Sequence, residues 1–206
     1  MTAETRRLPL RERNRVRTRS DILDAAAEAL SDGGYAATAL EELSRRAGLA
    51  RGTLYAHFPG GREEIVRAVY LRVAEEVEEA GRALREQESG APDRIAALAR
   101  ALVERTATAS GRFYGKTTAD ALPVLADVTG GTSAAFESLI REDLAATDLP
   151  TGADLDALTT AVSGALRASA ARTATHPHTV PAQVDAIRCL VSGLASTPGH
   201  RPQGPA

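Results

Sequence analysis

The sequence predicts an all-α protein with two helical domains, and three observations support this prediction. Apolar residues recur at steps of three and four in nearly every segment, which is the period of an amphipathic helix. The alternation of apolar and polar residues that marks a half-buried strand does not occur. Glycine and proline clusters, such as those at 33–34 and 59–61, separate the helical segments. We expect about nine helices.

The first three predicted helices lie close together in the sequence. Thr18 is the expected N-cap of the first, which ends at Gly33-Gly34. The spacing from Thr38 to Glu41 is that of a capping box and predicts a second helix that continues to Ala47. The third, over 51–58, has barely two turns. The apolar stripe of the first helix consists of Ile22, Leu23, Ala26, Ala27 and Leu30.

Longer helices are expected in the remainder of the chain. An amphipathic helix covers about 62–87, and a fifth helix opens at Pro92 and continues to about residue 109. Pro123 predicts a kinked or split helix. Glycines 130–131 predict a further break, followed by a helix that Thr132 or Ser133 caps and that ends near residue 147.

The last two helical segments each carry one apolar edge with small residues beside it. Such helices can approach closely, as an antiparallel pair or as a four-helix interface between two subunits. The edge residues are therefore the candidate dimer interface: Leu155, Leu158, Val162, Leu166, Val184, Ile187, Val191 and Leu194. The Pro/Gly-rich end at 197–206 is predicted to be disordered.

Composition and charge narrow the class of protein. An apolar fraction of 43% over 206 residues is enough for a well-buried core. Neither a signal peptide nor an apolar run of membrane-spanning length is present, so we expect a soluble cytoplasmic protein with no membrane partner. The single cysteine, Cys189, excludes an internal disulfide and a cysteine-based zinc site, and its thiol is expected in the core.

The formal net charge of −2 conceals a basic N-terminus. The first twenty residues carry seven arginines against Glu4 and Glu12, which leaves the rest of the chain acidic. A bias towards arginine explains why Lys116 is the only lysine, but it does not explain the clustering. We predict a basic flexible arm over 1–17 that binds a polyanion. A merely solvated tail is the alternative.

Residues 38–58 have the size and the turn of a helix-turn-helix, whose second helix enters the major groove of DNA. Gly48 permits the left-handed turn, while Leu49 and Leu54 are expected to face the core. Arginine can donate to guanine or to phosphate, and threonine can contact a thymine methyl or a phosphate. A corner with a purely structural role is the alternative. The candidate groove-facing residues are Arg51, Gly52, Thr53, Tyr55 and His57.

An ordered set of motifs extends over residues 18–65: Thr18-Arg19, Ile22-Leu23, Ala25-Ala26, Gly34-Tyr35, Thr38, Ala47-Gly48-Leu49, Gly52-Thr53-Leu54-Tyr55, His57-Phe58 and Arg62-Glu63. In this order they resemble the DNA-binding domain of TetR-family transcriptional regulators. The resemblance implies an all-helical homodimer with a DNA-binding domain over 18–61. It also implies a helical domain over 62–196 that binds a small-molecule effector and forms the dimer.

Carried over by position, the resemblance implies two kinds of DNA contact. Thr38, Tyr55 and His57 would anchor phosphates, and Arg51 and Thr53 would read the groove. Arg62 stands where the family usually has a lysine and would meet a phosphate at the start of the fourth helix. The basic arm would add contacts from Arg17 and Arg19 to the backbone or the minor groove.

The sequence departs from the family pattern at both ends of the third helix. Ala50 stands where the family usually has a serine N-cap, and the loss of such a cap typically costs about 1 kcal/mol. The turn at 59–61 is one residue longer than the common version, which changes the expected aim of Arg62.

No cofactor, metal or enzymatic activity is expected. The glycines at 111 and 115 enclose three residues where a phosphate-binding loop needs four. His176 and His178 lack a partner cysteine or carboxylate nearby, so solvated loop histidines are favoured over metal ligands. Among the aromatics, Phe113, Tyr114 and Phe136 are weak candidates for a ligand pocket, and core packing is the favoured alternative.

The sequence thus predicts a DNA-binding transcriptional regulator that a small molecule releases from a palindromic operator, most often a repressor in the family that it resembles. The alternative is an all-helical module that binds a small molecule or a protein and whose helix-turn-helix corner is only structural. The salt dependence of binding separates the two functions, because only a DNA binder loses affinity steeply as salt rises.

Overall fold

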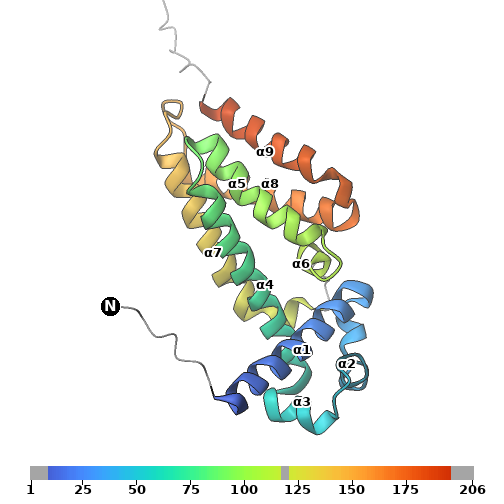
Figure 1. Cartoon of the computed structure of the whole chain (residues 1–206). Coiled ribbons are helices and arrows are strands. Elements are labelled where there is room, and N and C mark those ends of the chain that lie inside the picture. Colours follow the sequence, from blue (N-terminus) through green and yellow to red (C-terminus); the bar gives the residue numbers. More distant parts are fainter. Residues whose placement is uncertain (1–8, 117–120, 196–206) are drawn as a thin grey trace, which may run out of the picture.

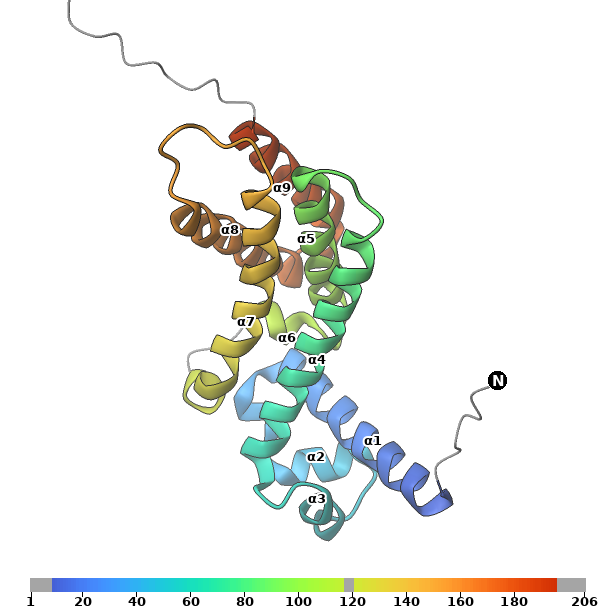
Figure 2. The same cartoon turned by 90° about the vertical axis from the view of Figure 1, so that its left-hand side faces the viewer.

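The computed structural model describes residues 9–116 and 121–195, which form an elongated stack of helices (Figures 1 and 2). These residues contain no strand, and the predicted all-α class is confirmed. None of their helices is long and apolar enough to cross a bilayer. The helices are α1 (Leu10–Gly33), α2 (Leu40–Ala47), α3 (Arg51–His57), α4 (Gly61–Arg85), α5 (Ala91–Ala107), α6 (Arg112–Gly115), α7 (Leu122–Ala145), α8 (Leu155–Thr175) and α9 (Val180–Ala195).

The three N-terminal helices and the start of α4 share a small core at one end of the molecule (Figure 1). Leu54 of α3 and Phe58 after it are buried against Ile22 of α1 and Leu43 of α2. Gly48 closes the turn between α2 and α3 with φ 65° and ψ 28°, a left-handed conformation that glycine adopts without a steric penalty. The predicted roles of Gly48 and Leu54 are confirmed.

Helix α4 joins this end of the molecule to the C-terminal helices. It contacts α1, and it also packs against α5 and α7. One hydrophobic cluster continues from Ile22 in α1 through Val69 in α4 to Val191 in α9. Helix α4 therefore contributes to the core at both ends of the molecule.

Helix α1 begins at Leu10, with Pro9 as its N-cap, and the predicted start at Thr18 is therefore wrong. Residues 10–17 are helical instead of forming a flexible arm. They carry no apolar stripe, but arginine has a high helix propensity, and the packed turns over 22–30 supply the nucleus from which the helix extends. Residues 1–8 of the predicted arm and the predicted disordered tail lie outside the described residues.

Helix α7 is continuous from Leu122 to Ala145, so neither the predicted split at Pro123 nor the break at 130–131 occurs. Pro123 lies in the first turn, where its missing N–H costs nothing. The two glycines reduce helix propensity by about 1 kcal/mol each. Packing of α7 against α4 and α8 offsets this cost, because tertiary contacts supply most of a helix's stability in a folded protein.

The predicted dimer-interface edges of α8 and α9 face the core of the chain itself. Val162, Leu166, Val184, Ile187 and Val191 are buried, and the other three edge residues, Leu155, Leu158 and Leu194, pack against the same core. An apolar stripe covers the core of its own domain first. The five buried side chains are therefore unavailable to a second chain in this structure, whereas Leu155, Leu158 and Leu194 remain partly exposed. Cys189, which was expected in the core, is exposed on α9.

A buried ionic cluster joins α4, α5 and α7 near the end of the molecule farthest from α3. The Arg85 guanidinium donates to both carboxylate oxygens of Asp143 at 2.8 and 2.7 Å. Arg94 Nε lies 2.9 Å from the same carboxylate, and Asp143 is only 2% exposed. The hydrogen bonds to Asp143 raise the pKa of Arg85 above its usual value, so the Arg85 guanidinium remains charged.

Candidate DNA interface and ligand cavity

Helix α3 lies at the outer end of the N-terminal helices (Figure 1) and has two distinct faces. Leu54 is buried and fixes the helix to α1 and α2. Arg51 and Gly52 are exposed, and Tyr55 is 49% exposed. Thr53 and His57 are half-buried. The structure therefore brings the predicted groove-facing residues together on one accessible surface.

The start of α3 is held without a side-chain cap. Ala50 is the N-cap residue, and no side chain there accepts a hydrogen bond from the helix. Ser44 of α2 instead donates its hydroxyl hydrogen bond to the carbonyl oxygen of Leu49. The turn that precedes α3 is thus fixed from α2.

Arg51 forms an ion pair with Glu41 of α2, and both side chains are more than half exposed. Exposed ion pairs contribute little to stability, so Arg51 can exchange Glu41 for a DNA group.

The two arginines of α2, Arg45 and Arg46, are both paired with Glu42 of the same helix. Hydrogen bonds from Arg45 and then Arg46 lower the pKa of Glu42 to about 2, so its carboxylate remains charged and holds both arginines at neutral pH.

Thr38 and Arg62 differ from the prediction that they bind phosphate. Thr38 is fully buried and donates to the Tyr35 carbonyl oxygen at 2.7 Å. Arg62 donates to Thr38 Oγ1 at 2.9 Å and to the same Tyr35 carbonyl, and its guanidinium lies 3.7 Å from the centre of the Tyr35 ring. The preceding Gly61 has φ 65°. Arg62 therefore links the start of α4 to the turn before α2.

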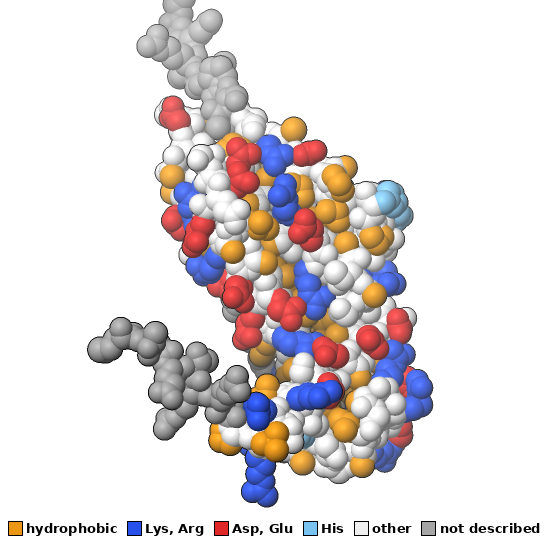
Figure 3. Space-filling model, in the orientation of Figure 1, with side chains coloured by type: hydrophobic (Ala, Val, Ile, Leu, Met, Phe, Trp, Pro, Cys, Tyr) orange, Lys and Arg blue, Asp and Glu red, His pale blue; other side chains and the backbone are white. Residues whose placement is uncertain are grey.

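Arg19 also has a structural contact. Its guanidinium donates to the His57 carbonyl oxygen at 3.0 Å and lies 4.0 Å from the centre of the Phe58 ring. Arg19 thus fastens α1 to the end of α3. Arg17 and the other arginines at the start of α1 are exposed. Figure 3 shows basic side chains at this end of the molecule, whereas acidic and basic side chains are interspersed over the upper helices.

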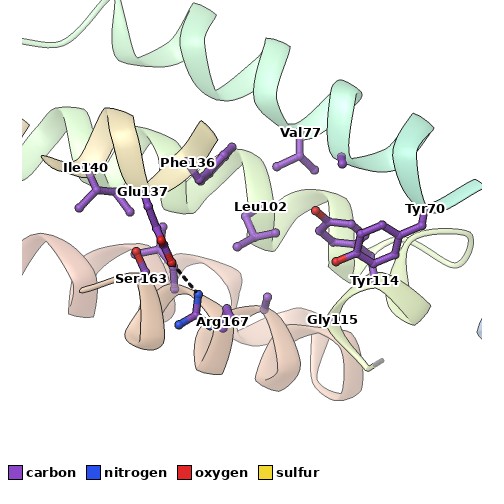
Figure 4. A pocket seen from close by; sticks show the side chains of 13 residues that line it. Tyr70, Val77, Leu102, Tyr114, Gly115, Phe136, Glu137, Ile140, Ser163 and Arg167 are labelled. Atoms are coloured by element: carbon purple, nitrogen blue, oxygen red, sulfur yellow. Dashed lines mark hydrogen bonds and ion pairs between the residues drawn. The ribbon is translucent and has the colours of Figure 1, made fainter. Parts of the chain in front are cut away.

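A cavity of about 300 Å³ lies among the C-terminal helices. Figure 4 shows Tyr70 and Tyr114 at one end, and Glu137, Ser163 and Arg167 at the other. Arg167 and Glu137 form an ion pair with an N to O distance of 3.3 Å. The cavity is lined by Tyr70, Ala74, Val77, Leu102, Tyr114, Gly115, Phe136, Glu137, Ile140, Ser163, Leu166, Arg167 and Ala170.

The aromatic candidates from the sequence divide between two hollows. Tyr114 and Phe136 line the cavity, whereas Phe113 lines a second hollow of about 200 Å³ among α1, α4, α6 and α7. Because Phe113 and Tyr114 are adjacent on α6, this short helix has one residue in each hollow. The polar residues of the cavity were not predicted, since nothing in the sequence indicates that Glu137 faces Arg167.

The loop histidines have no metal site around them. His176 and His178 lie with their ring centres 6.0 Å apart, and His176 Nδ1 hydrogen-bonds with the hydroxyl of Thr175 at 2.9 Å. No group of three potential metal ligands occurs in the part of the chain that the structure describes.

The sequence and the fold of this chain are similar to those of known proteins. Residues 22–69 match a family model described as bacterial regulatory proteins, tetR family. A TetR-family regulator from Pectobacterium atrosepticum is similar, with 25% identity and a TM-score of 0.64 over 90% of this chain and 98% of its own. A TetR-like regulator from a Rhodococcus species has 21% identity and a TM-score of 0.71, over 93% of this chain and 100% of its own.

The fatty acid degradation regulator FadR from Bacillus halodurans has 15% identity and a TM-score of 0.70, over 88% of this chain and 97% of its own. No curated protein matches the chain.

Proposed function

We propose that this chain, which belongs to the TetR family of bacterial regulatory proteins, is a homodimeric repressor that a small molecule releases from a palindromic operator. The observation that supports this most is the division of α3 into a buried anchor and an accessible polar face. Leu54 is 1% exposed, whereas Arg51 and Tyr55 project outwards. The accessible face carries arginine, threonine and tyrosine, side chains that contact bases and phosphates in protein–DNA complexes.

In the proposed complex, α3 lies in the major groove and α1 follows the backbone. Arg51 reads a base edge, while Thr53 and Tyr55 contact the groove or phosphates. The exposed arginines at the start of α1 extend the contact along the adjacent DNA. Each phosphate that they neutralise increases the loss of affinity with rising salt.

The dimer that we propose uses the outer faces of α8 and α9. On α9 the side opposite the buried residues carries Ala186, Leu190 and Gly193, all exposed. On α8 the corresponding side carries the exposed residues Ala157, Ala161 and Ala168. Small apolar faces allow helices of two copies to approach closely. The twofold axis of such a dimer would set the two α3 helices about 34 Å apart, one turn of DNA.

The cavity and α3 are connected through two elements. Tyr70, Ala74 and Val77 of α4 line the cavity, and the same helix begins at the Arg62 link to Tyr35. Tyr114 of α6 lines the cavity beside Phe113, and α6 contacts α1. A ligand that moves α4 or α6 therefore changes the separation of the α3 helices. For release, the ligand must bind the DNA-incompetent arrangement more tightly than the competent one.

Binding to DNA tests the proposed function directly. The purified protein should form a specific complex with a near-palindromic site upstream of its own or a neighbouring gene at moderate salt. We expect an affinity at least about a thousandfold higher than for random DNA, measured by mobility shift and fluorescence anisotropy. Without such a complex the function is wrong, and ligand binding that is insensitive to salt would favour the helical binding module instead.

Ala161→Glu should abolish the dimer while leaving the fold intact. It places a charge in the proposed interface, and an unpaired buried charge costs several kcal/mol. Sedimentation should then show a monomer whose circular dichroism is unchanged and which has lost operator binding. Ala83→Glu, an exposed alanine of α4, is the control and should remain dimeric. A dimeric Ala161→Glu protein would contradict this interface.

A further inference from the structure

The lining of the cavity includes a buried hydroxyl without a described hydrogen-bond partner. Ser163 is 4% exposed, and its Oγ has no hydrogen-bond partner among the described residues. Other hydroxyls of α8 bond to the helix itself, since Thr159 donates to the Leu155 carbonyl at 2.7 Å and Thr173 to that of Ser169 at 3.1 Å. A buried hydroxyl without a partner is costly, so a polar ligand atom beside Ser163 gains free energy.

Arg167 lies one helical turn after Ser163 on the same face of α8. The two side chains therefore present a guanidinium and a hydroxyl to one place at the end of the cavity (Figure 4). Glu137 of α7 now places its carboxylate there, with one contact of 3.3 Å to Arg167. The side chains of Glu137 and Arg167 are 40% and 56% exposed, so this long and partly solvated pair is weak.

The rest of the cavity is apolar or aromatic. Val77, Leu102 and Ile140 line its middle (Figure 4). Tyr70 lies against Tyr114 at the far end, with ring centres 4.6 Å apart and ring planes inclined by 35°. A volume of about 300 Å³ is at the small end of the range for ligand pockets. The cavity thus has one charged, partly solvated end and a mainly apolar body that ends at two tyrosines.

We infer that the effector of the proposed regulator is a small amphipathic monocarboxylate. Its carboxylate takes the place of the Glu137 carboxylate on Arg167 and accepts a hydrogen bond from the unpartnered Ser163 hydroxyl. Its apolar part lies between α4, α5 and α7 and reaches the two tyrosines. The position of the ligand carboxylate is already occupied by the carboxylate of Glu137. Both hydrogen-bond donors at this position, Ser163 and Arg167, belong to α8. Since this end is partly solvated, the head group keeps its charge without full desolvation. The regulatory role of this ligand rests on the proposed function, whereas its binding does not.

Calorimetry on the full-length protein tests the ligand class with three probes that share one alkyl chain. Octanoate should bind once per chain and at least about tenfold more tightly than octanol, because a hydrogen bond to a charged group is stronger than one to a neutral group. Octylamine should bind more weakly than octanol, because Arg167 repels it. Equal binding of octanoate and octanol, tighter binding of octylamine, or no binding of octanoate would each overturn the inference.

Substitutions at the charged end should change octanoate binding in opposite directions. Ser163→Ala should weaken it about tenfold and Arg167→Gln about thirtyfold. Glu137→Gln should strengthen it about fivefold, since the competing carboxylate is removed and Arg167 is freed; a folding defect cannot produce such a gain. Arg172→Gln, at an exposed arginine of α8 outside the cavity, is the control and should have no effect. Weaker binding by Glu137→Gln, or unchanged binding by Ser163→Ala, would contradict the inference.

The same experiment with DNA present separates the two proposals. If octanoate binds as described but no specific operator complex forms, the ligand assignment stands and the regulatory function fails. If the operator is bound but octanoate does not bind, the function stands and the monocarboxylate is wrong. If both hold, octanoate should release the operator from the wild type, and should do so at a lower concentration from Glu137→Gln.

Discussion

Replacing Arg51 with Ala is expected to weaken operator binding by about 2–6 kcal/mol, because one arginine contact to a base contributes about 1–3 kcal/mol and the proposed dimer has two copies. The free energy of unfolding should hardly change, since Arg51 is exposed and its only described partner is the exposed Glu41. Anisotropy titrations against the operator and against single-base variants measure both the loss of affinity and the relaxed specificity at the contacted position.

Two further variants make this prediction specific. Tyr55→Phe removes only a hydroxyl and should cost about 1 kcal/mol per half-site, without changing the dimer. Arg62→Gln should reduce the stability of the N-terminal domain as well as its DNA affinity, because Arg62 holds Thr38 and Tyr35. Full operator affinity in the Arg51→Ala protein, or its loss of the dimer, would contradict the proposed orientation of α3.

The second large effect is expected on protein stability, at a residue far from α3. Asp143→Asn should lower the free energy of unfolding by about 3–5 kcal/mol, the usual cost of removing one partner of a buried ion pair. Arg85 and the partly buried Arg94 are left facing a neutral amide. For a chain of this length the melting temperature should fall by roughly 10 °C, which calorimetry or circular dichroism can measure.

The neighbouring Glu142 provides a matched control. Its carboxylate lies 3.2 Å from Arg85, but its side chain is 65% exposed. Exposed ion pairs contribute about 0–1 kcal/mol, so Glu142→Gln should be nearly neutral. If the two substitutions destabilise the protein equally, burial is not what makes the Asp143 cluster important.

The sequence predicted helices where apolar periodicity is strong, and it missed features that depend on distant residues. Leu54 beside Tyr55 indicated the two faces of α3 correctly, because burial follows the helical period there: Leu54 and Phe58, four residues apart, are buried and Tyr55 is exposed. The start of α1 was missed, since residues 10–17 have no apolar stripe and become helical by extension from packed turns. The cluster of Arg85, Arg94 and Asp143 carries no motif, because its members meet only in the folded chain.

The candidate sites show the same limit. Periodicity on α8 and α9 identified the apolar edge of each helix. It does not determine whether such an edge packs within its own domain or against a partner chain. Val162 and Ile187 pack within their own domain. A charged side chain at the start of α4 was expected to meet phosphate. Instead Arg62 turns towards Tyr35, because the conformation of Gly61 determines where the first turn of α4 points. Such directions depend on backbone geometry that composition does not encode.

The uninterrupted length of α1 has a mechanical consequence. Its 24 residues form a rod of about 36 Å, with the exposed arginines at one end and Leu30, beside Phe113 of α6, at the other. If α1 moves as a rigid body, a small tilt at its contact with α6 displaces the arginines at its other end over a larger distance. In the proposed complex, the contact of these arginines with the DNA backbone would therefore depend on what occupies the cavity.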